Sequence, residues 1–196
     1  MAFSSIMEEL GSSAPTFRLP NTNPNAGNSV VSLEDFSDST ALLVAFICNH
    51  CPYVIHIRES FSALAAEYQS KGLGVVAICS NDVATHPADG PEKMKAEALA
   101  HGFPFPYLHD ETQNVAKAYR AACTPDFFLY EATQKLVYRG QFDGSRPNNE
   151  APIDGHGLRV ATDAVLAARA VTAEQIPSMG CNIKWKSGQE PDYFPG

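Results

Sequence analysis

ALLVAFICNHCPY, residues 41–53, joins seven consecutive apolar residues to a Cys-x-x-Cys pair. An apolar run of this length is typical of a strand that is buried on both faces of a parallel sheet. After the pair, apolar side chains recur every three or four residues from Val54 to Tyr68, as they do on one face of an amphipathic helix. The sequence therefore predicts that Cys48 and Cys51 lie on the turn between a buried strand and a helix.

Further elements are expected on both sides of this unit. Residues 74–79 form a second apolar run, and a strand, a helix and a strand of these lengths make a right-handed βαβ unit. The helix is expected to end near Ser70, because Gly72 follows as a stop signal. The other expected elements are an N-terminal hairpin of residues 14–19 and 30–33, a helix over 91–101, an extended run at 103–108, a helix over 113–122, a hairpin of 127–130 and 135–140, and a helix over 158–168.

This order of elements is that of a thioredoxin-like α/β fold, with a central mixed β-sheet flanked by helices and an N-terminal β-hairpin. A chain of 196 residues is long enough for one well-buried core and short for two, so we expect residues 1–196 to form a single domain. Residues 1–13 would be an N-terminal extension. Residues 175–196 contain several prolines and glycines and are expected to form an irregular tail across the outside of the domain.

Composition argues against several classes of function. The chain has 14 basic and 22 acidic residues, and no cluster of lysines and arginines stands out, so a nucleic-acid or anionic membrane surface is not expected. The N-terminal residues lack the charged and apolar regions of a secretory signal, and no apolar run approaches the roughly 20 residues that span a bilayer. We therefore expect a cytoplasmic protein. In that reducing compartment, five cysteines are expected to be reactive, metal-bound or buried thiols.

The Cys-x-x-Cys pair can carry dithiol chemistry. A thiol near a helix N-terminus can have its pKa lowered from about 8.5 to roughly 3.5–7.5, because unpaired N–H groups and the helix dipole stabilise the thiolate. We expect Cys48 to be the nucleophile in this position and Cys51 to be the resolving thiol. His50, when protonated, would further favour the Cys48 thiolate. Pro52 fits the first turn of the helix, where its missing N–H has no partner to lose.

Several motifs together resemble the peroxiredoxin-like, AhpC/TSA or TlpA-like branch of the thioredoxin superfamily. They cover nearly the whole chain and are Ala14-Pro15-x-Phe17-x-Leu19, Leu33-x-Asp35-Phe36, Cys48-Asn49-His50-Cys51-Pro52-Tyr53, Ser80-Asn81-Asp82, Cys123-Thr124-Pro125-Asp126-Phe127-Phe128-Leu129 and Gly180-Cys181-x-Ile183-Lys184-Trp185-Lys186. The resemblance implies the thioredoxin-like fold and the dithiol. It also implies a cis Thr124–Pro125 bond beside the dithiol, whose backbone groups would pair with an extended substrate.

The substrate-binding residues are thus expected to be Thr124, Pro125 and Asn49. Cys123 and Cys181 are possible additional redox thiols. Cys123 could lie near the dithiol or be a packed thiol. A tail that crosses the domain could bring Cys181 near Cys48, or Cys181 could simply fill space while its neighbours hold the tail in a groove. The loop of residues 80–90 would form a wall of the site.

One departure from the family pattern bears on the activity. Peroxiredoxins place their peroxide-attacking cysteine in a Pro-x-x-x-Thr/Ser-x-x-Cys frame, whereas this chain has Ala41 and Ala45 at the proline and hydroxyl positions before Cys48. The sequence therefore favours a thiol–disulfide oxidoreductase over a peroxidase. The substrate would be a disulfide-bearing protein, a small thiol or a peroxide, and thioredoxin or glutathione would be the reductant.

A third alternative belongs to another class. Cys48 and Cys51, with one or two of His50, Cys123 and Cys181, could bind or deliver a metal ion. Structural zinc sites usually have four ligands, and the chain has no second paired motif to supply them. No metal site and no cofactor are therefore expected for the leading function.

Overall fold

The computed structural model of the chain describes residues 2–172 and 174–194. Its centre is a five-stranded mixed sheet, in which the first three strands are parallel and the last two antiparallel to their neighbours. The strand order is β6 (Tyr107–His109), β5 (Leu73–Cys79), β4 (Ala41–Phe46), β8 (Asp126–Glu131) and β9 (Leu136–Gly140). The predicted apolar strand is thus β4, which lies in the middle of the sheet and is buried along its whole length.

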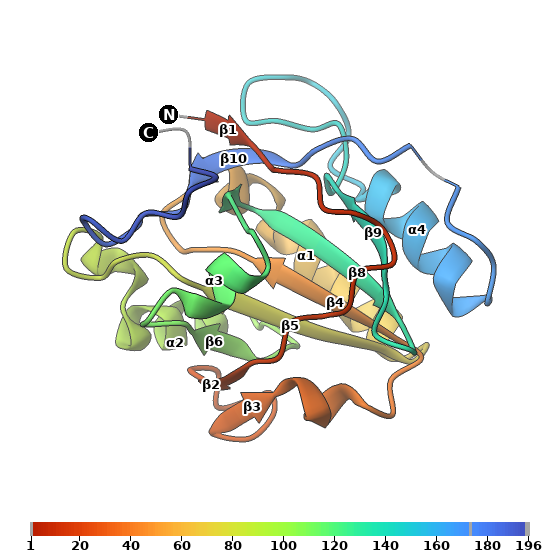
Figure 1. Ribbon diagram of the computed structural model, residues 1–196, viewed down its shortest axis with the longest axis horizontal. Coiled ribbons are helices and arrows are strands. Elements are labelled where there is room, and N and C mark those ends of the chain that lie inside the picture. Colours follow the sequence, from red (N-terminus) through yellow and green to blue (C-terminus); the bar gives the residue numbers. More distant parts are fainter. Residues whose placement is uncertain (1, 173, 195–196) are drawn as a thin grey trace.

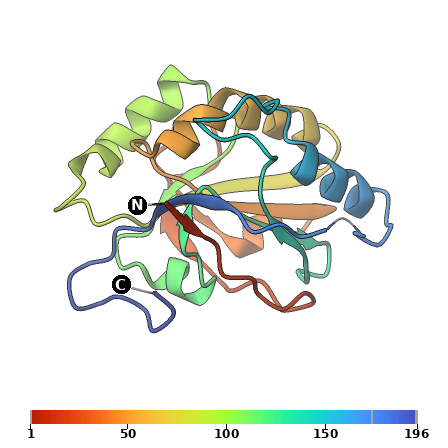
Figure 2. The same cartoon turned by 90° about the horizontal axis from the view of Figure 1, so that it is seen from above.

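Helices cover both faces of this sheet (Figures 1 and 2). One face carries α1 (Pro52–Gln69), α2 (Pro91–Ala100) and α4 (His156–Leu166). The other carries α3 (Asn114–Ala118) and the N-terminal hairpin of β2 (Arg18–Pro20) and β3 (Val30–Ser32). The described residues also form two short 3-10 helices, η1 (Leu33–Phe36) and η2 (Pro87–Asp89), and a small second sheet.

Alternation along β4 divides the core in two. Leu43 and Ala45 pack under α1, whereas Val44 and Phe46 pack under α3 and the N-terminal hairpin. Since successive side chains of a strand point to opposite faces, one apolar run supplies both halves of the core. The strand therefore ends between the two halves of the core, where residues 47–51 connect it to α1.

The expected irregular tail and N-terminal extension are wrong in part, because both ends enter a second sheet. Strand β10 (Met179–Asn182) pairs on one side with β1 (Ala2–Ser4) and on the other with β7 (Cys123–Thr124). Figure 1 shows β1 and β10 side by side. The physical reason is Gly180, where a Cβ atom would overlap the Thr124 carbonyl oxygen; glycine lets the two backbones approach.

The helix expected over residues 113–122 is also shorter than predicted. It ends after Ala118, and Arg120 then takes a left-handed conformation with a φ of 50°. The helix α1 ends as expected, since Gly72 follows it with a φ of 96°. None of the described helices is long and apolar enough to cross a membrane.

Candidate active site

The two cysteines of the Cys-x-x-Cys pair lie in the connection between β4 and α1, as the sequence predicts. Cys51 is the N-cap of α1 and Pro52 is its first residue, so Cys48 precedes the helix by a full turn. Their exposed fractions are only 1% and 0%. All five cysteines fall in the described ranges and are free thiols, so this is the reduced form of the pair.

Thr124 faces both cysteines from β7. Its hydroxyl oxygen lies 3.3 Å from the Cys48 sulfur, and its carbonyl oxygen accepts a hydrogen bond of 3.1 Å from the Cys51 thiol. The Thr124–Pro125 peptide bond is cis. The structure thus brings together the two motifs that the sequence assigns to one site.

The two thiols of the pair differ in acidity. The Cys48 thiol donates a hydrogen bond to the Cys51 sulfur, and this contact is the main cause that lowers the pKa of Cys51 to about 5. Burial opposes the change, whereas the Cys181 thiol and the N–H groups of Cys181 and Val54 add to it. The Thr124 carbonyl accepts a hydrogen bond only from the protonated Cys51 thiol, so this contact acts in the same direction as burial.

Cys48 shows the opposite behaviour. Its hydrogen bond to Cys51, then burial, then the nearby Cys79 and Asp89 raise the pKa of Cys48 well above its ordinary value. The expectation that the helix N-terminus makes Cys48 the stabilised thiolate is therefore wrong. The physical reason is that Cys48 keeps its proton in its contact with Cys51 and is buried away from solvent, and both effects disfavour a Cys48 thiolate.

His50 is held by Asp89, a residue that the sequence analysis did not single out. The His50 Nδ1 atom lies 2.6 Å from an Asp89 carboxylate oxygen. The Asn49 backbone N–H and the Asn81 side-chain amide also donate to this carboxylate, at 2.9 and 2.8 Å. Asp89 is fully buried and comes from η2, at the end of the loop predicted to wall the site. The loop composition predicted the wall, but no local pattern marked the aspartate.

The same residues include a possible metal-ligand set. Atoms of Cys48, His50 and Asp89 that could bind a metal lie within 4.8 Å of one another. This set contains Asp89 in place of the Cys51, Cys123 and Cys181 ligands considered from the sequence. Both Asp89 oxygens already accept hydrogen bonds, so a metal ion would have to replace these donors.

The expected substrate-binding role of the Thr124 backbone is contradicted by the position of β10. Cys181 pairs with Thr124 and Asn182 pairs with Cys123 in an antiparallel ladder. The chain's own tail therefore occupies the edge at which an extended substrate would pair. The sequence missed this because it assigned no strand to the tail.

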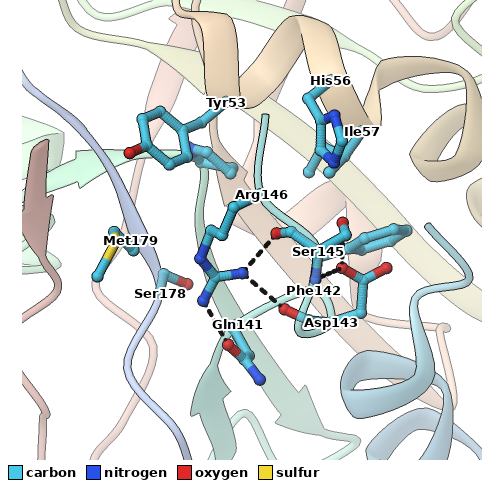
Figure 3. A pocket seen from close by; sticks show the side chains of 11 residues that line it. Tyr53, His56, Ile57, Gln141, Phe142, Asp143, Ser145, Arg146, Ser178 and Met179 are labelled. Atoms are coloured by element: carbon cyan, nitrogen blue, oxygen red, sulfur yellow. Dashed lines mark hydrogen bonds between the residues drawn. The ribbon is translucent and has the colours of Figure 1, made fainter. Parts of the chain in front are cut away.

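Pro125 lines a small pocket beside this edge (Figure 3). Tyr53 from the first turn of α1 and Met179 from β10 line one side of the pocket, and His56 and Ile57 of α1 lie across from them. The Arg146 guanidinium donates hydrogen bonds to Gln141 and to the backbone carbonyl oxygens of residues 143 and 145. The pocket therefore lies between β10 and the first turns of α1.

The remaining predicted residues lie as follows. Asn49 and His50 line a groove of about 470 Å³ on the side of α2. The Asn49 side chain donates to the Ala88 carbonyl and accepts from the Tyr107 hydroxyl, which fixes its orientation. Cys123 is fully buried, and the oxygens nearest its sulfur are the backbone carbonyl oxygens of Pro125 and Ser178. Cys181, in contrast, is partly exposed and faces Cys51.

Comparison of the sequence with known protein families agrees with this site, in which a strand, a Cys-x-x-Cys turn and a helix face a cis-proline. The family described as AhpC/TSA matches residues 10–139. The chain belongs to the AhpC/TSA family. Among curated proteins, none matches the chain. The resemblance drawn from the sequence motifs is thereby confirmed, and with it membership of a family of thiol redox proteins.

Solved structures confirm the thioredoxin-like fold of this AhpC/TSA protein. A hypothetical protein from Sinorhizobium meliloti 1021 is 50% identical, with a TM-score of 0.91, over 94% of this chain and 99% of that one. An uncharacterized conserved protein from Geobacillus kaustophilus is 51% identical, with a TM-score of 0.92, over 95% and 97% of the two chains. A peroxidoxin from Mycobacterium tuberculosis, 17% identical, shares the fold with a TM-score of 0.59 over 83% of this chain and 98% of its own.

Proposed function

We propose that this AhpC/TSA protein is a thiol–disulfide oxidoreductase in which Cys48 and Cys51 interconvert between a dithiol and a disulfide. The observation that carries the proposal is that Thr124 contacts both buried cysteines, since its hydroxyl oxygen lies 3.3 Å from the Cys48 sulfur and its carbonyl oxygen accepts a hydrogen bond of 3.1 Å from the Cys51 thiol. Two cysteines held against the same residue can form a disulfide with little movement of the backbone. This arrangement supports a redox role better than a packing role.

The reaction would proceed in two exchange steps. The Cys51 thiolate takes the proton of Cys48, and the Cys48 sulfur attacks an external disulfide R–S–S–R. The bond between the substrate sulfurs breaks, and the first RS⁻ leaves and takes this proton from Cys51, which becomes a thiolate again. The Cys51 thiolate then attacks the Cys48 sulfur, which forms the Cys48–Cys51 disulfide and expels the second RS⁻. The protein loses two electrons and the substrate gains two.

The acidity of Cys51 supports the second step of this scheme. The lowered pKa of Cys51 makes it a thiolate at neutral pH, as the second step requires. In the reverse direction the same property makes Cys51 a good leaving group when a thiol opens the disulfide. Stabilisation of the Cys51 thiolate also stabilises the reduced protein, so the couple is expected to be more oxidising than one with ordinary thiols.

Equilibration in glutathione buffers of increasing oxidation tests the proposal. Differential alkylation and mass spectrometry should show one disulfide, between Cys48 and Cys51, and Cys48→Ser should slow exchange with oxidised glutathione. Cys79→Ser is the matched control, because Cys79 is equally buried at the end of β5. Unchanged exchange in Cys48→Ser, or absence of the Cys48–Cys51 disulfide, would overturn the proposal.

The Thr124 hydroxyl favours a second candidate, a thiol peroxidase. It lies 3.3 Å from the Cys48 sulfur and could bond a peroxide oxygen in place of the hydroxyl missing at Ala45. Cys48 would then become a sulfenate as the peroxide is reduced to an alcohol or water, and Cys51 would convert the sulfenate to a disulfide. Rapid hydroperoxide consumption that is lost in Thr124→Val would support this activity. Slow hydroperoxide consumption, with Cys48 and Cys51 still recovered as free thiols after alkylation, would rule out the peroxidase activity.

A further inference from the structure

Strand β10 occupies the edge of β7 in the manner of a bound peptide. Its register places Cys181 directly opposite Thr124, the residue that also contacts Cys48 and Cys51. An extended substrate at this edge would have to occupy the place that β10 fills. The chain therefore holds one of its own cysteines where a substrate cysteine would lie.

Several contacts fix β10 in this place. Gly180 allows the close approach to Thr124, and Ile183 and Trp185 just beyond the strand are buried in the core. The Lys184 backbone N–H donates to the Asn81 side chain, and its carbonyl accepts from the Asp82 N–H, both at 2.8 Å. Because these contacts lie on both sides of Cys181 in the sequence, they hold Cys181 in a fixed position opposite Thr124.

Cys181 is also the most accessible thiol of the site. Cys48 and Cys51 are at most 1% exposed, whereas Cys181 is partly exposed. Residues two apart in a strand point to the same side, so Cys181 shares its side of β10 with Met179, which is 40% exposed and lines the pocket of Figure 3. A small thiol from solvent can therefore reach Cys181 more readily than the buried pair.

We propose that Cys181 is a third redox thiol. It replaces Cys48 as the disulfide partner of Cys51, so that the disulfide moves from the buried pair to a partly exposed sulfur. This inference rests on the proposed dithiol function and adds the route of its reductant. In the exchange, the Cys181 sulfur attacks Cys51 in the Cys48–Cys51 disulfide. The Cys51–Cys181 bond forms, the Cys48–Cys51 bond breaks, and the proton of Cys181 passes to Cys48, so no electrons leave the protein.

The acidities of the three thiols suit such an exchange. Burial raises the pKa of Cys181 to about 11, and the pKa of Cys48 is also raised, so both hold a proton at neutral pH when they are not in the disulfide. The exchange therefore creates no new buried charge. An external thiolate that attacks the exposed Cys181 sulfur then expels Cys51, the best leaving group of the three because of its lowered pKa.

Two partners could then act at different places. A substrate disulfide would be reduced at Cys48, on the side of the groove lined by Asn49 and His50. Two molecules of a thiol reductant would return two electrons at Cys181, on the side of the pocket in Figure 3, and leave as their disulfide. The tail would thus be part of the redox machinery and not only a cover for it.

Disulfide mapping in single-cysteine variants tests this route. In Cys48→Ser treated with oxidised glutathione, the Cys51 thiolate should first form a mixed disulfide and then a Cys51–Cys181 disulfide, found by mass spectrometry after alkylation. In Cys48→Ser/Cys181→Ser only the Cys51–glutathione adduct should remain. In Cys181→Ser the Cys48–Cys51 disulfide should still form, but its reduction by glutathione should slow by at least about tenfold, because only buried sulfurs remain.

Cys123→Ser is the matched control, since Cys123 lies next to Thr124 in β7 but its sulfur faces the carbonyl oxygens of Pro125 and Ser178. It should be reduced at the wild-type rate. No Cys51–Cys181 disulfide in Cys48→Ser, together with a wild-type reduction rate in Cys181→Ser, would overturn the relay and leave the dithiol function intact. Failure of the Cys48–Cys51 disulfide to form in the wild type and in Cys181→Ser would instead overturn the dithiol function. If Cys48→Ser does not fold, the rate in Cys181→Ser decides.

Discussion

At the scale of single residues, Asp89 organises the surroundings of the dithiol. Its fully buried carboxylate accepts hydrogen bonds from Asn49, His50 and Asn81, so it fixes the residues between the cysteines. Its negative charge is one of the causes that raise the pKa of Cys48. One side chain thus sets both the geometry and part of the acidity of the site.

The change Asp89→Asn should separate these two effects. Loss of the charge should lower the pKa of Cys48 and make Cys48 react faster with iodoacetamide at neutral pH, as measured by mass spectrometry. Loss of an acceptor for buried donors should lower the free energy of unfolding by about 1–3 kcal/mol. Asp110→Asn is the control, because Asp110 is equally buried but binds Ser80 and the Ala116 N–H. Equal Cys48 rates in the two variants would contradict the assigned role.

Asp126 should make the free energy of unfolding depend on pH. It forms a fully buried ion pair with Arg139, and burial raises the pKa of Asp126 to about 6. Because this exceeds the unfolded value of about 3.9, the group's stabilising contribution is complete below about pH 4 and is lost as the pH rises through about 6. The wild-type free energy of unfolding, relative to Asp126→Asn, should therefore fall by roughly 2–3 kcal/mol from pH 4 to pH 7. Urea unfolding at each pH measures it, and a constant difference would refute it.

At the scale of elements, two chain segments converge on α1 and decide its chemistry. Strand β4 delivers Cys48 to the start of the helix, and β10 delivers Cys181 to its N-cap Cys51. The first of these is a local connection, whereas the second depends on the ladder between β10 and β7. The acidity of Cys51 should therefore respond to changes in β10.

Gly180→Ala tests this dependence. The added Cβ would overlap the Thr124 carbonyl, so the strands should separate at a cost of about 1–3 kcal/mol in unfolding free energy. As Cys181 moves from Cys51, the pKa of Cys51 should rise, seen as an upward shift in the pH profile of its alkylation. Gly144→Ala is the control, because nothing lies within 4 Å of a Cβ there. A stable variant with an unchanged profile would mean that β10 does not influence Cys51.

At the scale of the whole molecule, the two ends of the chain meet beside the redox site. Strand β1 pairs with residues Met179 to Cys181 of β10, and Ser5 reinforces the pairing. The Ser5 N–H donates to the Ser178 carbonyl at 2.8 Å, and the Ser5 hydroxyl accepts from the Ser178 N–H at 3.1 Å. The N-terminus therefore supports the strand that carries Cys181.

Ser5→Ala should weaken the pairing of β10 with β1, although Ser5 lies far from β10 in the sequence. Loss of this buried acceptor should cost about 1–2 kcal/mol and speed local amide exchange in residues 178–182 by roughly 5- to 30-fold. Hydrogen exchange followed by mass spectrometry measures the effect. Ser4→Ala, at an exposed position of β1, should leave exchange unchanged. Faster exchange confined to residues 2–5 would show that the two ends are not coupled.

Some elements of this fold follow from local patterns in the sequence. The apolar run of β4, the helical spacing of α1 and the Cys-x-x-Cys turn between them depend on neighbours in the chain, and all three lie where the patterns predict. The motifs around Thr124 and Pro125 also identified the loop that faces the dithiol. Periodicity and motif spacing are short-range properties, so they can be read without a structure.

Which thiol is acidic and what covers the site depend on the tertiary structure. The low pKa of Cys51 depends first on its contact with Cys48 and then on Cys181 from the tail, and the buried Asp89 comes from a loop. Strand β10 is too short to show a pattern, and it forms because Gly180 permits close pairing with Thr124. These features arise from contacts between residues distant in sequence, where burial and charge act through space and leave no periodic trace in the chain.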